Sequence, residues 1–380
     1  MTTIRVPKQL TGTHTKLRAP TMVSMSSSPS PSSQLTIQVQ TKQIQLSQVS
    51  AEIMICKSNK DSDKNGMIQN QKPPLIFIHG SFHASWCWAE HYMPFFAALG
   101  YPCYALSLRG TGGTFAGEGV KKVKIGEHVH DLTDFIHHVQ DCESGSVVGA
   151  NNTSTSTSTT NTVKPVLIAH SFGGLAIMKY LECNLLRDSD SDDSSNDKQP
   201  PLALALSGVV MMCSVPPSGN GKMTMRFLQR SLVDSWKITA GLAMKKSLTN
   251  QDLCRDLFFG DDETILNEDL ERFQGYFKRD TVATIDLMDL AKQLPSVHVD
   301  DGDGKAVFLK GTDHGSGNRL ASLVIGAKDD FIVDAEGVEE TARYYGVEPV
   351  VVDSPHDVML GNNWENGANA IKRWLEEEVM

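Results

Sequence analysis

Acidic residues are missing from the first 51 positions, where five basic residues lie among many Ser and Thr. A basic, Ser-rich and acid-free segment is typical of organelle transit peptides, and this one has no apolar core of about 7–15 residues such as a secretory signal needs. We therefore expect residues 1–50 to be a transit peptide or a disordered segment. Its sparse Arg favours the plastid (chloroplast), with the mitochondrion and the cytoplasm as alternatives.

Long apolar runs and paired cysteines are missing as well. No stretch approaches the roughly 18 consecutive apolar residues of a membrane-spanning helix, so we expect no membrane span. The seven cysteines are an odd number and form no C-x-x-C pair, which argues against a disulfide framework and against a zinc site. The formal net charge of −10 makes nucleic acid a poor partner.

The chain does have ample apolar residues, arranged as short runs that alternate with longer amphipathic ones. Hydrophobic residues make up 40% of the 380 positions, enough for a substantial core. The short runs predict strands at 35–48, 51–57, 75–78, 103–108, 166–169, 202–212, 322–326 and 349–353. The longer ones predict helices at 86–99, 125–139, 173–185, 335–345 and 367–377. Such alternation is typical of an α/β fold with a parallel sheet covered by helices on both faces.

Three segments interrupt this alternation. Two low-complexity tracts, 144–164 and 187–201, cannot bury enough apolar surface to fold and are expected to be solvated loops. Between 213 and 320 the strand pattern stops, and helices are predicted at 223–233, 253–259, 268–277 and 282–294. We expect an α/β core formed by 51–212 and 321–380, with 213–320 as a helical cap over the strand ends.

The sequence around Ser171 is the most informative stretch. A predicted strand runs directly into the letters HSFGG and then into a helix. A serine at such a turn takes a strained backbone conformation, which small residues two positions before and after it permit. Here these are Ala169 and Gly173, and Ala169 departs from the usual glycine by one methyl group. The turn exposes the hydroxyl at a helix N-terminus, so Ser171 is a candidate nucleophile.

A nucleophilic serine needs an imidazole base, and the imidazole needs a carboxylate that fixes its tautomer. Both follow Ser171 in the chain, at the carboxyl ends of predicted parallel strands, where open α/β sheets place their sites. His356 is the candidate base. We expect Asp329 to be the acid because it lies at the turn itself, with Asp330 as its rival. Asp357 adjoins His356 along the chain, so we expect its side chain to point elsewhere.

An oxyanion hole should come from an early strand-to-helix loop and from the N–H group that follows the nucleophile. The loop after the 75–78 strand reads HGSFH. The backbone N–H groups of Ser81 or Phe82, together with that of Phe172, are the candidates. We expect His79 and His83 to have structural or rim positions rather than chemical roles.

As a set, the motifs HGSFHASWCW, LRGTGG, AHSFGG, GAKDDFIVD and SPHDVMLG resemble those of the α/β-hydrolase superfamily. Within it, the chain resembles plant and algal plastid α/β hydrolases and the plant methylesterase and hydroxynitrile lyase group. The resemblance runs from about residue 75 to the C-terminus. It implies an eight-stranded, mostly parallel sheet, no metal and no organic cofactor. Ser171, Asp329 and His356 fall on the family's catalytic triad, and Phe82 and Phe172 fall on its oxyanion positions.

These observations lead us to expect a serine esterase or lipase-like enzyme that cleaves a small carboxylic ester through an acyl-enzyme. The alternatives are an acyltransferase or lyase with the same residues, and a non-catalytic ligand-binding protein on this fold. The expected cap is rich in Met and aromatic residues, which favours an apolar or acyl ester, although most of them are expected to be packing residues. They are Met223, Met225, Phe227, Trp236, Met244, Phe258, Phe259, Phe273, Phe277 and Met288.

Overall fold

The computed structural model describes residues 37–58, 72–144, 163–185, 205–260, 265–299, 302–306, 309 and 320–380. Residues 1–36 of the expected transit segment, residues 145–162 of the first low-complexity tract and all of the tract 187–201 lie outside these ranges. The described residues belong to one compact unit that begins at Thr36. The cap expected at 213–320 is therefore packed on the core rather than a separate unit.

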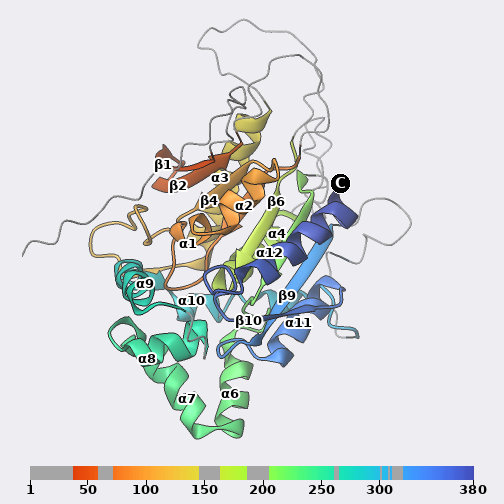
Figure 1. The fold of residues 1–380 in the computed structure, drawn as a ribbon. Helices are drawn as coiled ribbons and strands as arrows, with labels where there is room; N and C mark the ends of the chain where they lie inside the picture. Colours follow the sequence, from red (N-terminus) through yellow and green to blue (C-terminus); the bar gives the residue numbers. More distant parts are fainter. Residues whose placement is uncertain are drawn as a thin grey trace, which may run out of the picture. The chain divides into compact units, whose positions relative to one another are not determined.

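A central sheet of eight strands runs in the order β1-β2-β4-β3-β6-β7-β9-β10 (Figure 1). The pairs β1–β2 and β2–β4 are antiparallel, and the other five pairs are parallel. The strands are β1 (Gln38–Gln45), β2 (Ser50–Lys57), β3 (Leu75–Ile78), β4 (Cys103–Leu106), β6 (Val166–His170), β7 (Gly208–Met212), β9 (Ala321–Asp329) and β10 (Val350–Pro355). The α/β fold with a mostly parallel sheet is confirmed.

The edge strand β1 begins at Gln38, before residue 51, where the core is expected to begin. β1 pairs with β2 along its whole length, from Gln38 opposite Lys57 to Gln45 opposite Ser50. The sheet therefore begins inside the segment 1–50, and a boundary at residue 50 would cut this hairpin. The alternating pattern at 35–48 is the signal that locates this strand correctly.

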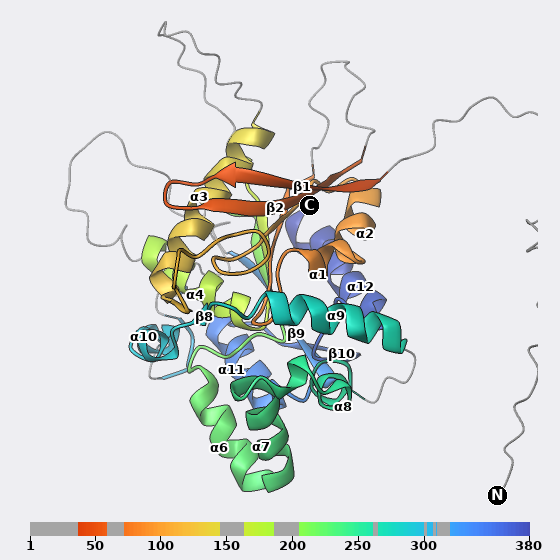
Figure 2. The same cartoon turned by 90° about the vertical axis from the view of Figure 1, so that its left-hand side faces the viewer.

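Helices cover both faces of the sheet because neighbouring strand residues point to opposite sides. Phe77 packs into one apolar cluster with α1, α2 and α12, whereas Ile76 and Ile78 pack into another with α3, α4 and α11 (Figure 2). These helices are α1 (Trp86–Ala89), α2 (Tyr92–Ala98), α3 (Ile125–Glu143), α4 (Phe172–Leu185), α11 (Ala335–Tyr345) and α12 (Trp364–Trp374), which the turn η7 (Leu375–Val379) follows. The single helix predicted at 86–99 is thus two helices.

The insert between β7 and β9 is helical, with one exception. It contains α6 (Asn220–Arg230), α7 (Leu232–Ile238), α8 (Gln251–Cys254), α9 (Asn267–Arg279) and α10 (Leu287–Leu290), with short turns η2 (Thr239–Ala243), η3 (Lys246–Leu248), η4 (Arg255–Phe259) and η5 (Pro295–His298). The helix predicted at 282–294 is wrong in its first part. There β8 (Thr284–Ile285), with two β-branched residues, pairs with β5 (Lys122–Val123) and leaves only a short helix.

The cap is fixed to the core by buried polar contacts around Asp280. The Trp86 indole donates to its carboxylate at 2.9 Å, and the Gly112 N–H donates to it at 2.8 Å. The side chain of Asp280 is fully buried. Because such buried bonds are costly to leave unmade, they hold α9 in one position over the loops that follow β3 and β4.

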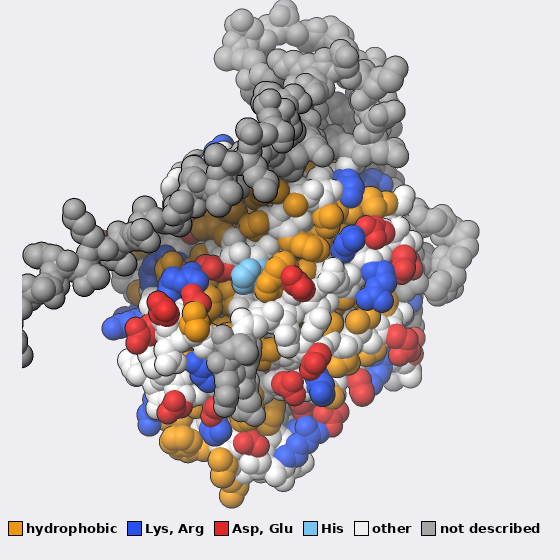
Figure 3. Space-filling model, in the orientation of Figure 1, with side chains coloured by type: hydrophobic (Ala, Val, Ile, Leu, Met, Phe, Trp, Pro, Cys, Tyr) orange, Lys and Arg blue, Asp and Glu red, His pale blue; other side chains and the backbone are white. Residues whose placement is uncertain are grey.

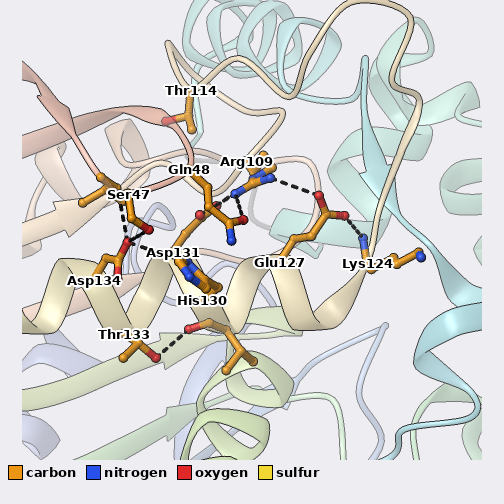
Figure 4. Close-up of polar contacts among 12 residues, drawn as sticks. Ser47, Gln48, Arg109, Thr114, Lys124, Glu127, His130, Asp131, Thr133 and Asp134 are labelled. Atoms are coloured by element: carbon orange, nitrogen blue, oxygen red, sulfur yellow. Dashed lines mark hydrogen bonds and ion pairs between the residues drawn. The ribbon is translucent and has the colours of Figure 1, made fainter.

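The arginine of the LRGTGG motif has a structural role. Arg109 binds the Asp131 carboxylate through two nitrogens, at 2.9 and 2.6 Å, and also donates to Glu127 and Gln48 (Figure 4). Such fork-shaped pairs are directional as well as strong. They tie α3 to the loop after β4 and to the turn between β1 and β2. In the loop after β4, the Thr114 hydroxyl accepts a hydrogen bond from the backbone N–H of Glu52, which lies in β2.

Candidate active site

Ser171 occupies a sharp turn between β6 and α4. Its φ angle is +52°, in the left-handed region that costs a residue with a side chain roughly 1–2 kcal/mol. Backbone bonds hold this conformation. The Ser171 N–H donates to the Met212 carbonyl at 3.0 Å, and its carbonyl accepts from Gly174 and Val215 at 3.1 Å. The predicted strained elbow is present.

Two glycines make room for this turn. A Cβ atom on Gly173 would lie 2.7 Å from the backbone oxygens of Ile78 and His79, and one on Gly80 would lie 2.8 Å from the Ser171 Cβ. Neither position can hold a larger residue without movement of the backbone. Ala169 is fully buried in the core, so its extra methyl group fills space there. The turn therefore requires glycine after the serine, and it accepts alanine before it.

His356 follows β10 and is buried against a carboxylate. Its Nδ1 atom lies 2.9 Å from both carboxylate oxygens of Asp330. The side chains of His356 and Asp330 are 2% and 1% exposed. One oxygen of Asp330 also accepts the N–H groups of Ile332 and Val333 at 2.8 Å. The carboxylate is thus fixed by its own loop and can orient the imidazole ring.

The carboxylate that contacts His356 is that of Asp330 and not that of Asp329, the expected acid. β9 was predicted to end at Gly326, but it continues to Asp329, which is exposed and pairs with Pro355 at the end of β10. Asp330 is therefore the first residue after the strand. Because successive side chains of a strand point to opposite faces, a shift of one position decides which carboxylate reaches His356.

Opposing effects set the charge state of His356. Burial lowers the pKa of His356. The charge of Asp330, the hydrogen bond that His356 donates to Asp330 and the charge of Asp357 raise it, and the net result is a pKa above the ordinary 6.5. A base with a raised pKa accepts a proton more readily, which suits the partner of a serine nucleophile.

Ser171 and His356 lie at the same edge of the sheet. The His170 ring, next to Ser171, is 4.7 Å from the His356 ring between centroids, and its Nε2 donates to the His356 carbonyl at 3.0 Å. Within the described residues no hydrogen bond joins Ser171 to His356 directly. Such bonds are often long in unliganded sites and tighten when the substrate binds.

The loop after β3 presents backbone donors next to this turn. Phe82 has a φ angle of +71°, a second non-glycine residue in the left-handed region. Among the described residues, the backbone N–H groups of Ser81, Phe82 and Phe172 meet no acceptor. Phe172 is the first residue of α4, where N–H groups have no partner within the helix. The three predicted oxyanion donors are thus available for a ligand.

His79 holds the base of the loop and stays neutral. Burial lowers the pKa of His79 to about 4, partly offset by its bond to Gly80. Its Nδ1 donates to the Gly80 carbonyl at 2.8 Å, and its Nε2 accepts the Leu108 N–H at 2.9 Å. This is the structural role expected for His79.

A buried pair connects the loop after β3 to the loop that contains His356. His83 lies 2.9 Å from the Asp357 carboxylate through Nε2 and 2.8 Å from the Ser81 carbonyl through Nδ1. The side chains of His83 and Asp357 are almost fully buried. Both ring nitrogens face oxygen acceptors, so the pair needs a proton between His83 and Asp357. Contrary to the expectation that the Asp357 side chain points elsewhere, one of its carboxylate oxygens lies within 4.8 Å of a ring nitrogen of His356. Its contact with His83 across 274 positions could not be predicted.

Two groups of donors could approach a metal ion. They are His170, His356 and Asp357, and Cys213, Asp330 and His356. Several of their atoms already have protein partners: His356 Nδ1 bonds to Asp330, His170 Nε2 bonds to a carbonyl, and one Asp357 oxygen bonds to His83. The resemblance also implied no metal here. We therefore assign these groups to the hydrogen-bond network of the site.

Cys213 is the site residue that sequence reasoning missed. It follows β7 with a φ angle of +45°, and its thiol lies beside Asp330 and His356. Burial, with the adjacent Asp330, raises the pKa of Cys213 well above its ordinary value, so the thiol stays protonated. Its position directly after β7, at the carboxyl end of a parallel strand, was the available signal.

The comparisons with known proteins agree with this architecture. Residues 75–366 match the model of the alpha/beta hydrolase family. The chain is similar to a thermophilic esterase from Thermogutta terrifontis (TM-score 0.53, 15% identity, covering 90% of this chain and 100% of that one). It is also similar to an enol-lactonase from Burkholderia xenovorans LB400 (TM-score 0.54, 11% identity, covering 88% of this chain and 100% of that one). A third similar structure is an epoxide hydrolase from Vigna radiata (TM-score 0.51, 16% identity, covering 89% of this chain and 98% of that one).

At these identities the similarity to solved structures shows the fold and not the substrate. The sequence matches no curated protein. Among the described helices, none is long and apolar enough to cross a membrane. The family match covers most of the chain, and the turn at Ser171, the sheet order and the inserted helices agree with it. The chain belongs to the alpha/beta hydrolase family.

Proposed function

We propose that this protein hydrolyses a small carboxylic ester, with Ser171 as nucleophile, His356 as base and Asp330 as the acid that orients the base. The observation that carries the proposal is the combination of a left-handed serine turn with a buried imidazole held by a carboxylate at the same sheet edge. This is the arrangement that acyl transfer through serine requires.

In the first half of the reaction, His356 Nε2 accepts the Ser171 proton while Oγ forms a bond to the ester carbonyl carbon. The carbonyl oxygen becomes negative, and the N–H groups of Phe82 and Phe172 stabilise that charge. When the intermediate collapses, the bond to the alcohol oxygen breaks and His356 returns the proton to the leaving alcohol. Asp330 stabilises the imidazolium that exists between these steps.

In the second half, water replaces the alcohol. His356 accepts a proton from the water, whose oxygen attacks the acyl carbon, and the second collapse releases the carboxylic acid and returns the proton to Ser171. An acyltransferase would use an alcohol in place of water at this step. The esterase and the enol-lactonase among the similar structures favour water, because the names of both denote ester hydrolysis.

The surroundings of His356 favour an apolar ester. Phe258 of the cap lies 6.5 Å from the His356 ring and 5.8 Å from the Phe82 ring between centroids. Phe277 packs 4.7 Å from His83. Aromatic walls exclude water and strengthen the electrostatic interactions of the triad. Phe82 is the one of these phenylalanines that is not fully buried, so an acyl or alcohol group with an apolar chain would contact its ring.

The test is a series of p-nitrophenyl esters of increasing acyl length, assayed with the full chain and with Ser171→Ala. We expect turnover by the wild type, an optimum at one chain length and a loss of at least about 10³-fold in the variant. Circular dichroism of Ser171→Ala is the control for folding. Wild-type protein that cleaves none of these esters, or a Ser171→Ala variant that cleaves them equally well, would refute the proposal.

A further inference from the structure

The α6–α7 hairpin of the cap, with the end of the following turn η2, exposes a group of apolar side chains. Each is between 46% and 77% exposed: Met225, Leu228, Leu232, Val233, Trp236 and Met244. α6 packs through a different stripe, since Met223 is buried and Phe227 contacts the core. α7 reverses the usual rule for surface helices, because it buries Ser235 and exposes Trp236. The exposed group is therefore not what holds the hairpin in place.

The hairpin is a fixed part of the cap. Arg226 forms two bonds of 2.6 Å to Asp334, and Arg230 pairs with Glu336, at the beginning of α11. Figures 1 and 2 show α6 and α7 side by side at the lower end of both views, and Figure 3 shows hydrophobic side chains gathered at that end. The apolar group is thus presented outward on a rigid support.

The charge of the hairpin is opposite to that of the whole chain. Residues 219–250 contain six basic residues and one acidic residue, whereas the chain as a whole has a net charge of −10. Three of the six, Arg226, Arg230 and Lys237, form ion pairs with carboxylates of neighbouring segments. Among the described residues, no carboxylate forms an ion pair with Lys222, Lys245 or Lys246. The ammonium group of Lys246 lies 5.5 Å from the Trp236 ring centroid. Lys245 donates to the Thr281 carbonyl at 2.6 Å. The apolar surface thus keeps a small positive charge, contributed by Lys222, Lys245 and Lys246, on a protein that is acidic as a whole.

Charge decides between the possible occupants of this surface. A second copy in a two-fold dimer would bring the same basic patch against itself, which like charges oppose. Helices that expose Trp and Leu together with Lys and Arg are typical of segments that lie in the interface of an anionic membrane. Each basic residue close to such a surface strengthens partitioning by roughly fivefold.

We propose that the α6–α7 hairpin docks the protein on an anionic phospholipid surface, with Leu232, Val233 and Trp236 inserted among the lipids and the lysines at the headgroups. The proposal depends on the exposed surface alone and not on ester hydrolysis. Its consequence is that the cap, whose Phe258 contacts the His356 ring, faces the lipid surface. Apolar substrates dissolved in that surface would then reach the site without crossing bulk water.

Vesicle flotation tests the proposal, with phosphatidylcholine vesicles that contain or lack phosphatidylglycerol. We expect the full chain to float with the anionic vesicles and to do so less at high salt, which screens the lysines. The double variant Leu232→Ser/Trp236→Ser should bind at least about tenfold more weakly. Ser171→Ala should bind like the wild type, which separates docking from catalysis.

Met288→Ser is the matched control, because Met288 is also well exposed on the cap but lies on α10, outside the hairpin. It should float like the wild type. Thermal unfolding of each variant checks that the fold is kept. The proposal is overturned if the wild type floats with neither vesicle or if the double variant floats equally well. It is also overturned if gel filtration shows a wild-type dimer that the double variant loses, since the hairpin would then bind protein.

Discussion

Replacement of Asp330 by Asn tests which carboxylate serves His356. Asn keeps the volume of the side chain and an oxygen that can accept the Ile332 and Val333 N–H groups. It removes the negative charge 2.9 Å from His356 Nδ1 and offers an NH₂ group that favours the wrong imidazole tautomer. The analogous change in a serine protease triad lowers kcat about 10⁴-fold. We expect a loss of this order, equivalent to roughly 5 kcal/mol of barrier.

Asp329→Asn is the matched control, because Asp329 carries the same charge one position earlier but is exposed. We expect it to change kcat by less than about threefold, as is usual for exposed surface substitutions. The assay is steady-state hydrolysis of a p-nitrophenyl ester, with circular dichroism as the check on folding. Equal losses in the two variants, or an Asp330→Asn variant with more than a tenth of wild-type kcat, would refute the assignment.

Three further predictions follow from the site and its support. The wild-type rate should fall as the pH drops through the pKa of His356, which lies above 6.5, because the protonated ring cannot act as a base. A pH profile of kcat/KM whose acid limb lies below pH 6 would contradict this. Asp357→Asn should lower the free energy of unfolding by about 3–5 kcal/mol, since it leaves the buried His83 without its carboxylate. Urea unfolding measures the change, and a loss below about 1 kcal/mol would contradict this prediction. Gly173→Ala should destabilise the protein by about 1–3 kcal/mol, because its Cβ would lie 2.7 Å from two backbone oxygens. Thermal unfolding measures the change. Gly126→Ala is the control and should be tolerated, because nothing lies within 4 Å of the added Cβ there.

The fold was predictable because parallel strands buried on both faces are continuous apolar runs. The runs at 75–78 and 166–169 matched β3 and most of β6, and the helix at 335–345 matched α11 at both ends. The break between α1 and α2 was not visible, since the residues of both helices continue one apolar pattern. β8 was missed because a two-residue strand is defined by its partner rather than by its own sequence.

The site was predictable where chemistry dictates the residue type at a local turn. Ser171 and its glycine neighbour were visible for that reason. The acid was assigned one residue too early because an apolar pattern does not show how far β9 continues past Gly326. The contact between His83 and Asp357 depends on the packing of two distant loops, and a single sequence contains no signal for such a pair.

The most direct test of the proposed chemistry is the covalent adduct on the nucleophile. Purified full-length protein is incubated with a fluorophosphonate, and its intact mass and peptide masses are measured beside those of Ser171→Ala. We expect one adduct on the wild type, located in the peptide that contains Ser171, and none on the variant. An unlabelled wild type, or equal labelling of Ser171→Ala, would contradict the assignment of Ser171 as the nucleophile.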